Sequence, residues 1–416
     1  MPRILLVGTA DTKSAEILFL RQCIEEAGGS AIILDVGVLG APQFVTDIPN
    51  HVVAAEANCS LADLAASGDE NFSISQMARG AARIAARLHA CGEIDGMLAL
   101  GGTMGTDLAL DVAAVLPVGV PKVLLSTIAH SHLLPPERIP QDLMAILWAG
   151  GLHGLNRLCR ASMLHAAGAV VGACRSAAAM DTSRPLVGMT SLGSSVLRYM
   201  KPLTAALEAR GYEVAVFHTA GMGGQAFEAL AAKGEFAAVL DFSLQELAND
   251  ALGSCVTAGP DRLLGAGRAS VPQIVAPGAT DMVDFASSRD IPLAFADRAV
   301  HVHNRLVASA GTTAQERSEL AQNIAQRLQE ATGPTCLLLP VRGVDEWDRP
   351  GLPMHAPEGL HAFLVAMRSA AQDLTVVEVD AHINDDAFCA AALKVFDDWV
   401  DKGWIIRPAP RLQRKA

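Results

Sequence analysis

Short apolar runs alternate along the chain with longer segments whose apolar residues recur at helical spacing. The first run spans residues 3–7. The segment after Lys13 places four apolar residues on one helical face: Ile17, Leu20, Ile24 and Ala27. A second apolar run spans residues 31–37. This order predicts a strand, a helix and a strand joined by a right-handed connection, with the two strands parallel.

The alternation continues to the end of the chain and predicts an α/β fold with mostly parallel sheets. In the first half, further strands are expected at 94–102 and 122–127, and helices at 74–89, from Thr106 and at 155–179. In the second half, strands are expected at 185–190, 213–219, 236–242, 272–278, 335–341 and 375–383. The polar segment 181–185 separates the halves, so we expect domains at 1–181 and 182–416.

Composition narrows the classes of function. Of the 416 residues, 51% are hydrophobic and the net charge is −12. Duplex nucleic acid and anionic membranes both select a basic face, so neither is an expected partner, whereas small molecules are. The eight cysteines form no C-x-x-C pair, and no charged segment followed by an apolar run opens the chain. We therefore expect reduced thiols and a cytoplasmic protein.

The loop after the first predicted strand, "GTADTK", is a candidate phosphate cradle. The carboxyl ends of parallel strands meet at one edge of a sheet, where ligands bind. The candidate residues are Gly8, Thr9, Asp11, Thr12 and Lys13. The spacing is not that of a Walker A loop, and the alternative is that Asp11 or Thr12 only caps the following helix.

The stretch "GGTMGTD" offers similar chemistry at the end of the strand expected at 94–102. Its candidate residues are Gly101, Gly102, Thr103, Gly105 and Thr106. The glycine spacing is not G-x-G-x-x-G, which argues against a nicotinamide cofactor. Adjacent glycines before a helix still let the backbone approach an anion, and the alternative is a tight turn.

The second half repeats the pattern in "HTAGMGGQ". Three glycines, Gly221, Gly223 and Gly224, follow a predicted strand and precede a helix. We interpret them as a second ligand loop. The two glycine-lined edges then predict a ligand site in a central cleft between the domains.

Ionisable residues at strand ends are candidates for acid–base catalysis. They are His218, Asp241, Asp380 and His382. We expect His382, oriented by Asp380 or a backbone carbonyl, to move a proton. The alternative is that His382 only satisfies buried backbone groups. The pairs His130/His132 and His301/His303 have no third local ligand, so no metal site is predicted.

Several stretches together resemble a known family. "GTADTK", "AGPDRL" and "DAHIND" occur, in this order, in the Tm-1-like ATP-binding domain family, uncharacterised proteins named for their similarity to the N-terminal half of the tomato mosaic virus resistance protein. The resemblance covers nearly the whole chain. It implies two Rossmann-like domains, ATP as the bound nucleotide and a homodimer, without implying a reaction.

Three functions therefore remain open at the level of sequence. The first is ATP binding near Gly8–Lys13 and Gly101–Thr106, with Asp11 or Asp107 available to Mg²⁺. The second is an enzyme that acts on a small anionic substrate by acid–base chemistry in the cleft. The third is a regulatory binding module without turnover.

Overall fold

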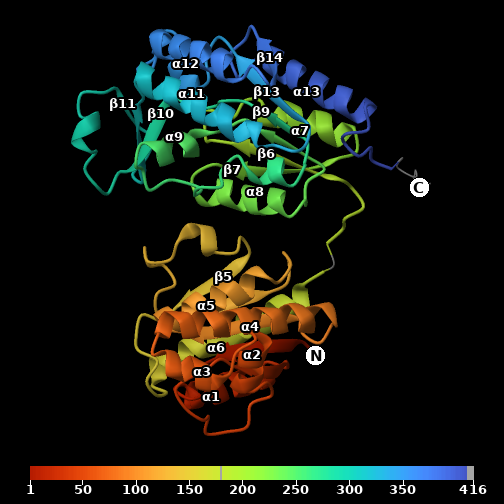
Figure 1. Ribbon diagram of the computed structural model, residues 1–416, viewed down its shortest axis with the longest axis vertical. Helices are drawn as coiled ribbons and strands as arrows, with labels where there is room; N and C mark the ends of the chain where they lie inside the picture. The colour runs from red at the N-terminus through yellow and green to blue at the C-terminus, as the bar shows by residue number, and fades with distance from the viewer. Residues whose placement is uncertain (179, 410–416) are drawn as a thin grey trace. The chain divides into compact units, whose positions relative to one another are not determined.

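The computed structural model describes residues 1–178 and 180–409. It divides into two compact units, Met1–Met180 and Asp181–Ala416 (Figure 1). Position 179, where the helix expected at 155–179 ends, lies outside the described residues. Each unit contains a parallel sheet flanked by helices, which confirms the predicted α/β class.

The first unit has a five-stranded sheet in the order β2-β1-β3-β4-β5, with every neighbouring pair parallel. Its strands are β1 (Arg3–Gly8), β2 (Ser30–Asp35), β3 (Gly96–Gly101), β4 (Lys122–Ser126) and β5 (Leu143–Leu147). Its helices are α1 (Ser14–Glu26), α2 (Asn50–Glu56), α3 (Leu61–Ser67), α4 (Glu70–Ala90), α5 (Thr103–Ala114) and α6 (Arg157–Ser176).

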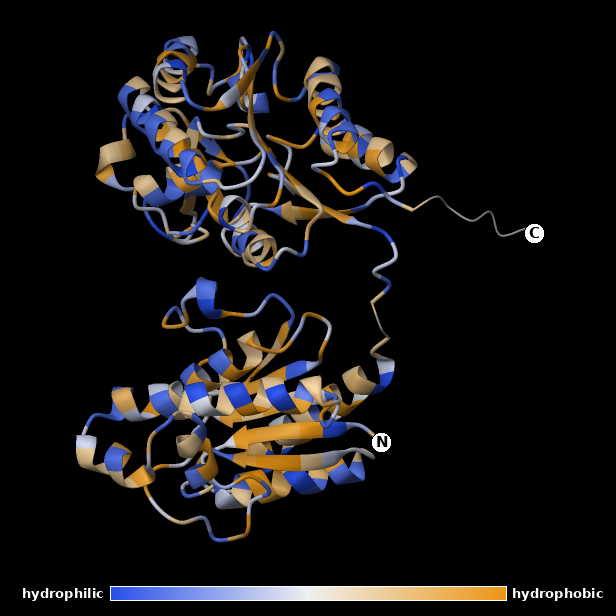
Figure 2. Ribbon diagram, turned by 45° about the vertical axis from the view of Figure 1, so that its right-hand side comes forward, coloured by the Kyte–Doolittle hydropathy of each residue, from blue (hydrophilic) through white to orange (hydrophobic). Residues whose placement is uncertain are grey.

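Helices cover both faces of this sheet, which explains the continuous apolar strands. Ile4 and Leu6 of β1 pack with α1 and α6, while Leu5 and Val7 pack with α2, α4 and α5. Successive side chains of a strand point to opposite faces, so both sets must be apolar. Figure 2 shows the resulting hydrophobic strands between amphipathic helices.

The second unit has a six-stranded parallel sheet in the order β14-β13-β9-β8-β6-β7. Its strands are β6 (Leu186–Ser191), β7 (Glu213–His218), β8 (Ala238–Asp241), β9 (Gln273–Val275), β13 (Thr335–Pro340) and β14 (Thr375–Val379). The helices around it are α7 (Met200–Ala209), α8 (Met222–Ala232), α9 (Gln245–Ala251), α10 (Gly265–Arg268), α11 (Ala314–Gln329), α12 (Pro357–Ala370) and α13 (Asp386–Asp401).

A small antiparallel sheet in the second unit was not predicted. It consists of β10 (Met282–Ala286), β12 (Val307–Gly311) and β11 (Val300–Val302), in that order. Its strands are three to five residues long, and β11 is largely exposed. Such short segments carry little apolar periodicity, so tertiary packing decides their conformation.

Two findings bear on the environment of the protein. Among the described residues, no helix combines the length and the apolar character that a bilayer crossing requires. All eight cysteines occur as free thiols.

Candidate functional site

The carboxyl ends of β1 and β3 form the switch point of the first sheet. The connection from β1 runs to β2 on one side, whereas β3 lies on the other side and leads to β4 and β5. Ligands of open parallel sheets bind beside such a point. The predicted loops 8–13 and 101–106 follow these two neighbouring strands, so the structure brings them to one edge.

The first loop turns tightly into α1. The N–H of Lys13 donates to the carbonyl of Thr9 at 2.9 Å, and the hydroxyls of Thr9 and Thr12 lie 2.9 Å apart. Lys13 occupies the N-cap position without a side-chain bond to the helix. Among the described residues its ammonium has no hydrogen-bond or ion-pair partner. Lys13 is therefore available to an anion, and neither Asp11 nor Thr12 acts as the helix cap.

Acidic side chains already surround the start of α1. Asp35, fully buried, accepts hydrogen bonds from the N–H groups of Ala10 and Gly37, and burial raises its pKa. Glu16, 3% exposed in the first turn, accepts from the N–H of Gly154 at 2.8 Å. These carboxyls compensate the positive end of α1, so the helix terminus itself offers little to a second anion.

The start of α5 is different, because its first turn carries no acidic residue and no side-chain cap. A Cβ on its N-cap residue Gly102 would lie 3.8 Å from Thr127 Oγ1, an ordinary van der Waals distance, so a small side chain fits there without a clash. Thr103 is exposed. The free N–H groups of this turn therefore point to a place where an anion is electrostatically favoured.

Three other residues of this loop serve internal packing. A Cβ on Gly101 would lie 2.6 Å from Gly105 Cα, and one on Gly105 would lie 3.3 Å from the carbonyl of Leu100. The buried hydroxyl of Thr106 bonds to Ser126 at 2.6 Å. The tight-turn alternative thus explains Gly101, Gly105 and Thr106, whereas it does not account for Gly102 or for the exposed Thr103.

The carboxylates considered for Mg²⁺ have protein partners. Asp107 pairs with Arg138, and Asp11 accepts the N–H of Leu39 at 2.8 Å. Within residues 1–178 and 180–409, no three metal-ligating side chains are grouped to hold an ion. Mg²⁺ bound with a nucleotide commonly takes one or two carboxylates plus phosphate oxygens. Asp11, whose Oδ1 is buried without a hydrogen bond, is the better placed of the two.

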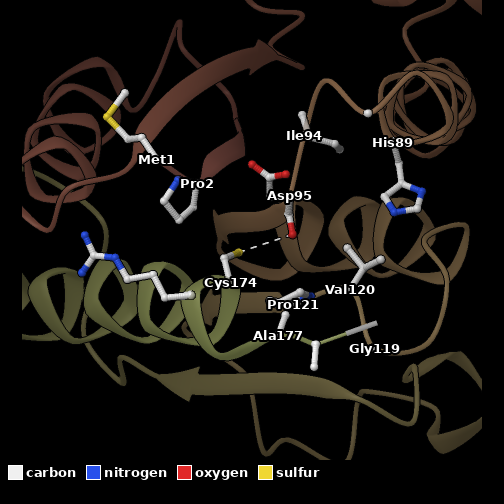
Figure 3. A pocket seen from close by; sticks show the side chains of 13 residues that line it. Met1, Pro2, His89, Ile94, Asp95, Gly119, Val120, Pro121, Cys174 and Ala177 are labelled. Carbon is white, nitrogen blue, oxygen red and sulfur yellow. Dashed lines mark hydrogen bonds between the residues drawn. The ribbon is translucent and has the colours of Figure 1, made fainter. Parts of the chain in front are cut away.

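A cavity of the first unit lies at the opposite edge of its sheet (Figure 3). This open pocket of about 610 Å³ is lined by Pro2, Asp95 and Pro121, which precede β1, β3 and β4. Cys174 also lines it, donates to the carbonyl of Asp95 and has its pKa raised to about 11 by burial. Its thiol is thus protonated near neutral pH, and the pocket contains none of the predicted site residues.

In the second unit, the glycine loop after β7 holds a carboxylate of the protein itself. The N–H of Gly221 donates to Glu246 Oε1 at 2.7 Å, and a Cβ on Gly224 would lie 1.8 Å from Glu246 Oε2. A Cβ on Gly223 would lie 1.8 Å from the carbonyl of His218. Internal contacts therefore account for all three glycines, and a ligand is not required to explain them.

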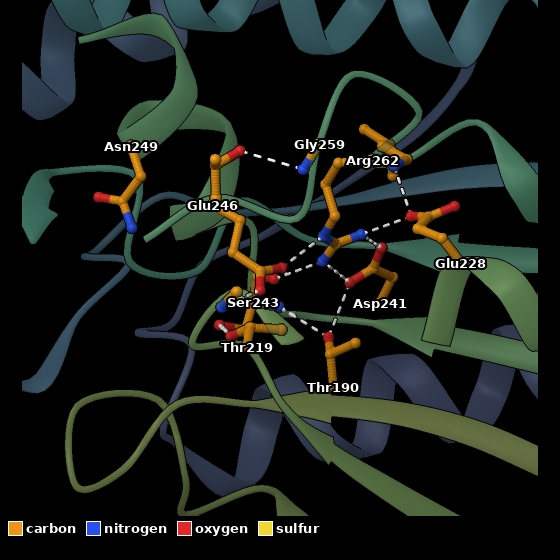
Figure 4. Close-up of polar contacts among 12 residues, drawn as sticks. Thr190, Thr219, Glu228, Asp241, Ser243, Glu246, Asn249, Gly259 and Arg262 are labelled. Carbon is orange, nitrogen blue, oxygen red and sulfur yellow. Dashed lines mark hydrogen bonds and ion pairs between the residues drawn. The ribbon is translucent and has the colours of Figure 1, made fainter. Parts of the chain in front are cut away.

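Glu246 belongs to a buried network centred on Arg262 (Figure 4). The guanidinium is 1% exposed and pairs with Asp241 at 2.5 Å, Glu246 at 2.8 Å and Glu228 at 2.8 Å. Burial raises the pKa of Glu228 and raises that of Glu246 to about 7. Asp241, a predicted catalytic acid, also accepts from the Thr190 hydroxyl at 2.7 Å, so both of its oxygens are engaged within the protein.

His382 and Asp380 do not act on each other. The His382 ring is 2% exposed; its Nε2 lies 2.9 Å from the carbonyl of Asp345, and its Nδ1 accepts the N–H of Asn384 at 3.1 Å. Burial lowers its pKa. Asp380 is exposed and paired with Arg342. His382 thus matches the alternative in which the ring satisfies backbone groups, and Asp380 does not orient it.

His382 and the Gly221–Gly224 loop also follow different edges of the sheet. The glycine loop follows β7 and the His382 loop follows β14, and these strands are the two outermost ones. The strand order therefore does not bring His382 and the glycine loop together.

His218 instead lies beside residues that the sequence analysis did not place together. The N–H of Gly193 donates to His218 Nδ1 at 3.4 Å, and a Cβ on Gly193 would lie within 4.0 Å of both His218 and His303. Both imidazoles act electrostatically on the buried carboxyl of Asp284, whose pKa is raised by burial. The ring of His301 stacks on Trp347 with centroids 3.9 Å apart.

Buried polar atoms without partners accumulate near this edge. Both carboxylate oxygens of Asp281, Oδ2 of Asp345, Nη1 of Arg317 and the amide of Gln245 are buried without a hydrogen-bond partner. Burial raises the pKa of Asp281 to about 7 and raises that of Asp345 well above its usual range. The stretch "APGATDMVDF" contains Asp281 and Asp284, but its acids do not occur at a predicted strand end, so the strand pattern gave no signal for them.

Comparisons with known proteins extend these findings. Family models described as the N-terminal and C-terminal domains of an uncharacterised protein family, UPF0261, match residues 2–179 and 184–400. A UPF0261 protein of Brucella melitensis is 51% identical over 98% of this chain and 97% of its own length.

More distant similarities also appear. The ToMV resistance protein Tm-1(GCR237) of Solanum lycopersicum is 27% identical over 95% of this chain and 55% of that protein. The similarity that the sequence motifs indicated is thus confirmed as a distant one. A crystal structure of a putative UDP-N-acetylglucosamine 2-epimerase from Listeria monocytogenes covers 99% of both chains at 9% identity, with a TM-score of 0.21.

Proposed function

The chain belongs to the uncharacterised protein family UPF0261, and from the loops at the carboxyl edge of its first sheet we propose that it binds a nucleotide, with ATP as the first candidate. The distant similarity to the tomato resistance protein and the motif resemblance supply ATP as the candidate. The neighbouring positions of β1 and β3 in the first sheet support a phosphate site at the ends of these strands.

The observation that carries this proposal is one unpaired ammonium and one uncapped helix start at the β1/β3 switch point of the described chain. The ammonium of Lys13 has no protein partner among the described residues, and the first turn of α5 has neither a side-chain cap nor an acid. The loops that carry them follow neighbouring parallel strands. A phosphate placed there receives backbone N–H groups from one loop and an ammonium from the other.

The acids at the start of α1 refine the expected pose. Glu16 and Asp35 are buried there and hydrogen-bonded to backbone N–H groups. They repel an anion that approaches α1 directly. The phosphates are therefore expected over Gly102 and Thr103, with Lys13 reaching them across the edge.

Calorimetry tests this proposal with ATP, ADP and AMP, each with and without Mg²⁺. Lys13→Ala should weaken ATP binding about tenfold to a hundredfold, because a hydrogen bond to a charged group contributes roughly 1.5–3 kcal/mol. The melting temperature of the free protein should stay unchanged. Lys201→Ala, in α7 of the second unit, is the matched control. Equal ATP affinity in the native and Lys13→Ala proteins would refute the assignment.

A second candidate function is acid–base chemistry on a small anion in the second unit. It is favoured by the placement of His218 and His303 beside Gly193, with the buried carboxyl of Asp284 acting on both rings. An imidazole is a side chain that can donate and accept protons in acid–base chemistry, and here two of them lie near one carboxyl. In this candidate His218 keeps its predicted catalytic role, whereas His382 and Asp241 do not take part.

A further inference from the structure

A pocket of about 370 Å³ opens in the first unit beside the start of α5. Apolar side chains from α4, α5 and the loop after β4 form much of its wall: Ile74, Leu110, Ile128, Leu133 and Leu134. Its volume falls within the range of cavities that bury small organic ligands.

The mouth of the pocket exposes apolar surface. Leu133 is 60% exposed and Met104 is 51% exposed, and both side chains line the same cavity. Large apolar residues that are exposed singly are common in soluble proteins, but their convergence on one concave site is typical of ligand binding. An apolar, planar group would cover both side chains at once.

Polar groups are placed at one side of this pocket. Asp107 is held by Arg138, which also donates to Asp111 at 2.8 Å, so the ion pair forms a fixed wall. A carboxylate in this position can accept hydrogen bonds from sugar hydroxyls. Asn71, at the start of α4, adds an amide that can both donate and accept.

The pocket is continuous with the place assigned to phosphate. Thr103 and Met104 line it, and the same two residues open α5 with no acid in their turn. We propose that the pocket holds the nucleoside end of the bound nucleotide, with its base against Leu133 and Leu134 and its sugar toward Asp107. This inference rests on the proposed nucleotide binding and adds to it a site for the base and the sugar of the ligand.

The test compares three probes by calorimetry: inorganic triphosphate, adenosine and ATP. ATP should bind more tightly than triphosphate, because only ATP fills the pocket. Leu133→Ser should lower ATP affinity about fivefold to tenfold and leave triphosphate affinity unchanged, since the truncated side chain removes apolar contact area only. Leu164→Ser, at a 48% exposed leucine of α6 that does not line the pocket, is the matched control.

Each other outcome has a distinct meaning. If triphosphate and ATP bind equally and Leu133→Ser changes neither, the pocket assignment is wrong while the proposed phosphate site stands. If adenosine binds and triphosphate does not, the pocket assignment stands and the phosphate site is refuted. If no probe binds, both are overturned. In a second variant, Ile128→Trp, the larger side chain fills the cavity and should weaken the binding of both adenosine and ATP. This variant distinguishes a loss of ligand contacts from a loss of folding.

Discussion

The loops after β3 and β7 share one sequence pattern, glycines between a strand and a helix, but they differ in what fills them. In the loop after β7, the N–H of Gly221 and the space beside Gly224 are taken by Glu246. In the loop after β3, a Cβ on Gly102 would meet only an ordinary van der Waals contact, and the first turn of α5 has no acid. A glycine loop can therefore serve the protein's own carboxylate or leave room for a foreign anion, and only the contacts distinguish the two cases.

We call the loop after β7, which is occupied by Glu246, the filled loop. The largest loss of stability there should follow from the removal of Arg262, the cation at the centre of the network. Arg262→Met leaves Asp241, Glu246 and Glu228 buried without their counter-charge. We expect the free energy of unfolding of the second unit to fall by about 3–5 kcal/mol. Denaturant unfolding followed by tryptophan fluorescence measures it.

The matched control is Arg268→Met, which removes an exposed guanidinium paired with Asp261 and Glu330. That change should cost less than about 1 kcal/mol. Equal losses from the two variants would show that the buried network does not hold the second unit together.

The filled loop should also make stability depend on pH. Burial raises the pKa of Glu246 from 4.5 to about 7, so the folded protein binds its proton more tightly than the unfolded chain does. The free energy of unfolding must then fall as pH rises from about 4.5 to about 7. Between pH 5 and pH 8 the titration of Glu246 should lower the free energy of unfolding by about 2–3 kcal/mol.

Denaturant unfolding at several pH values, compared between the native protein and Glu246→Gln, isolates the contribution of Glu246 to the pH dependence. The fall with pH should be smaller in Glu246→Gln than in the native protein, since all other titrating groups are shared. Glu235→Gln, at an exposed position of the same unit, should keep the native slope. A native slope in Glu246→Gln would assign the dependence to another buried acid, such as Asp281.

A direct comparison of the two loops uses one substitution in each. Gly223→Ala places a Cβ 1.8 Å from the carbonyl of His218, so the backbone must shift, and we expect a loss of about 1–3 kcal/mol. Gly102→Ala places its Cβ at an ordinary van der Waals distance of 3.8 Å from Thr127 Oγ1 and should change stability by less than about 0.5 kcal/mol. Thermal unfolding measures both. Similar losses at the two positions would remove the distinction between a filled and an open loop.

The last expected loss of stability concerns His382. His382→Asn removes the ring contacts to the Asp345 carbonyl and the Asn384 N–H, which should lower the free energy of unfolding by about 1–2 kcal/mol. His361→Asn, at an exposed position of α12, is the control. Unchanged stability in His382→Asn would return this residue to the set of catalytic candidates.

Much of the fold could be predicted from the sequence, because parallel strands covered on both faces require continuous apolar runs. Ile4 to Val7 show this requirement directly. The short strands β10, β11 and β12 lack such runs, and they were missed. The glycine-rich loops could be located in the sequence, but the groups that their residues contact could not. That Gly101 packs on Gly105, or that Gly224 faces Glu246, depends on tertiary distances that local spacing does not encode.

The acid–base candidates show the same difference. His218 and His382 both lie near the ends of predicted strands, and nothing in their local sequence tells an exposed ring from a buried one bonded on both nitrogens. The tertiary contacts decide it, since both nitrogens of His382 have backbone partners, whereas His218 is exposed. Arg262 lies in the family motif "AGPDRL", but no role could be assigned to it from the sequence, because its three acidic partners lie 16 to 34 residues away.

The Arg262 network also has a kinetic consequence. Its members come from α8, β8, α9 and the segment before α10, so four separate elements must all be in place before Arg262 is fully paired, and we expect these contacts to form late in folding. Contacts that form late are absent from the folding transition state, and breaking them is the first step in the reverse direction. We therefore expect the network to affect the unfolding rate of the second unit more than its folding rate. Arg262 would then act mainly by slowing spontaneous unfolding.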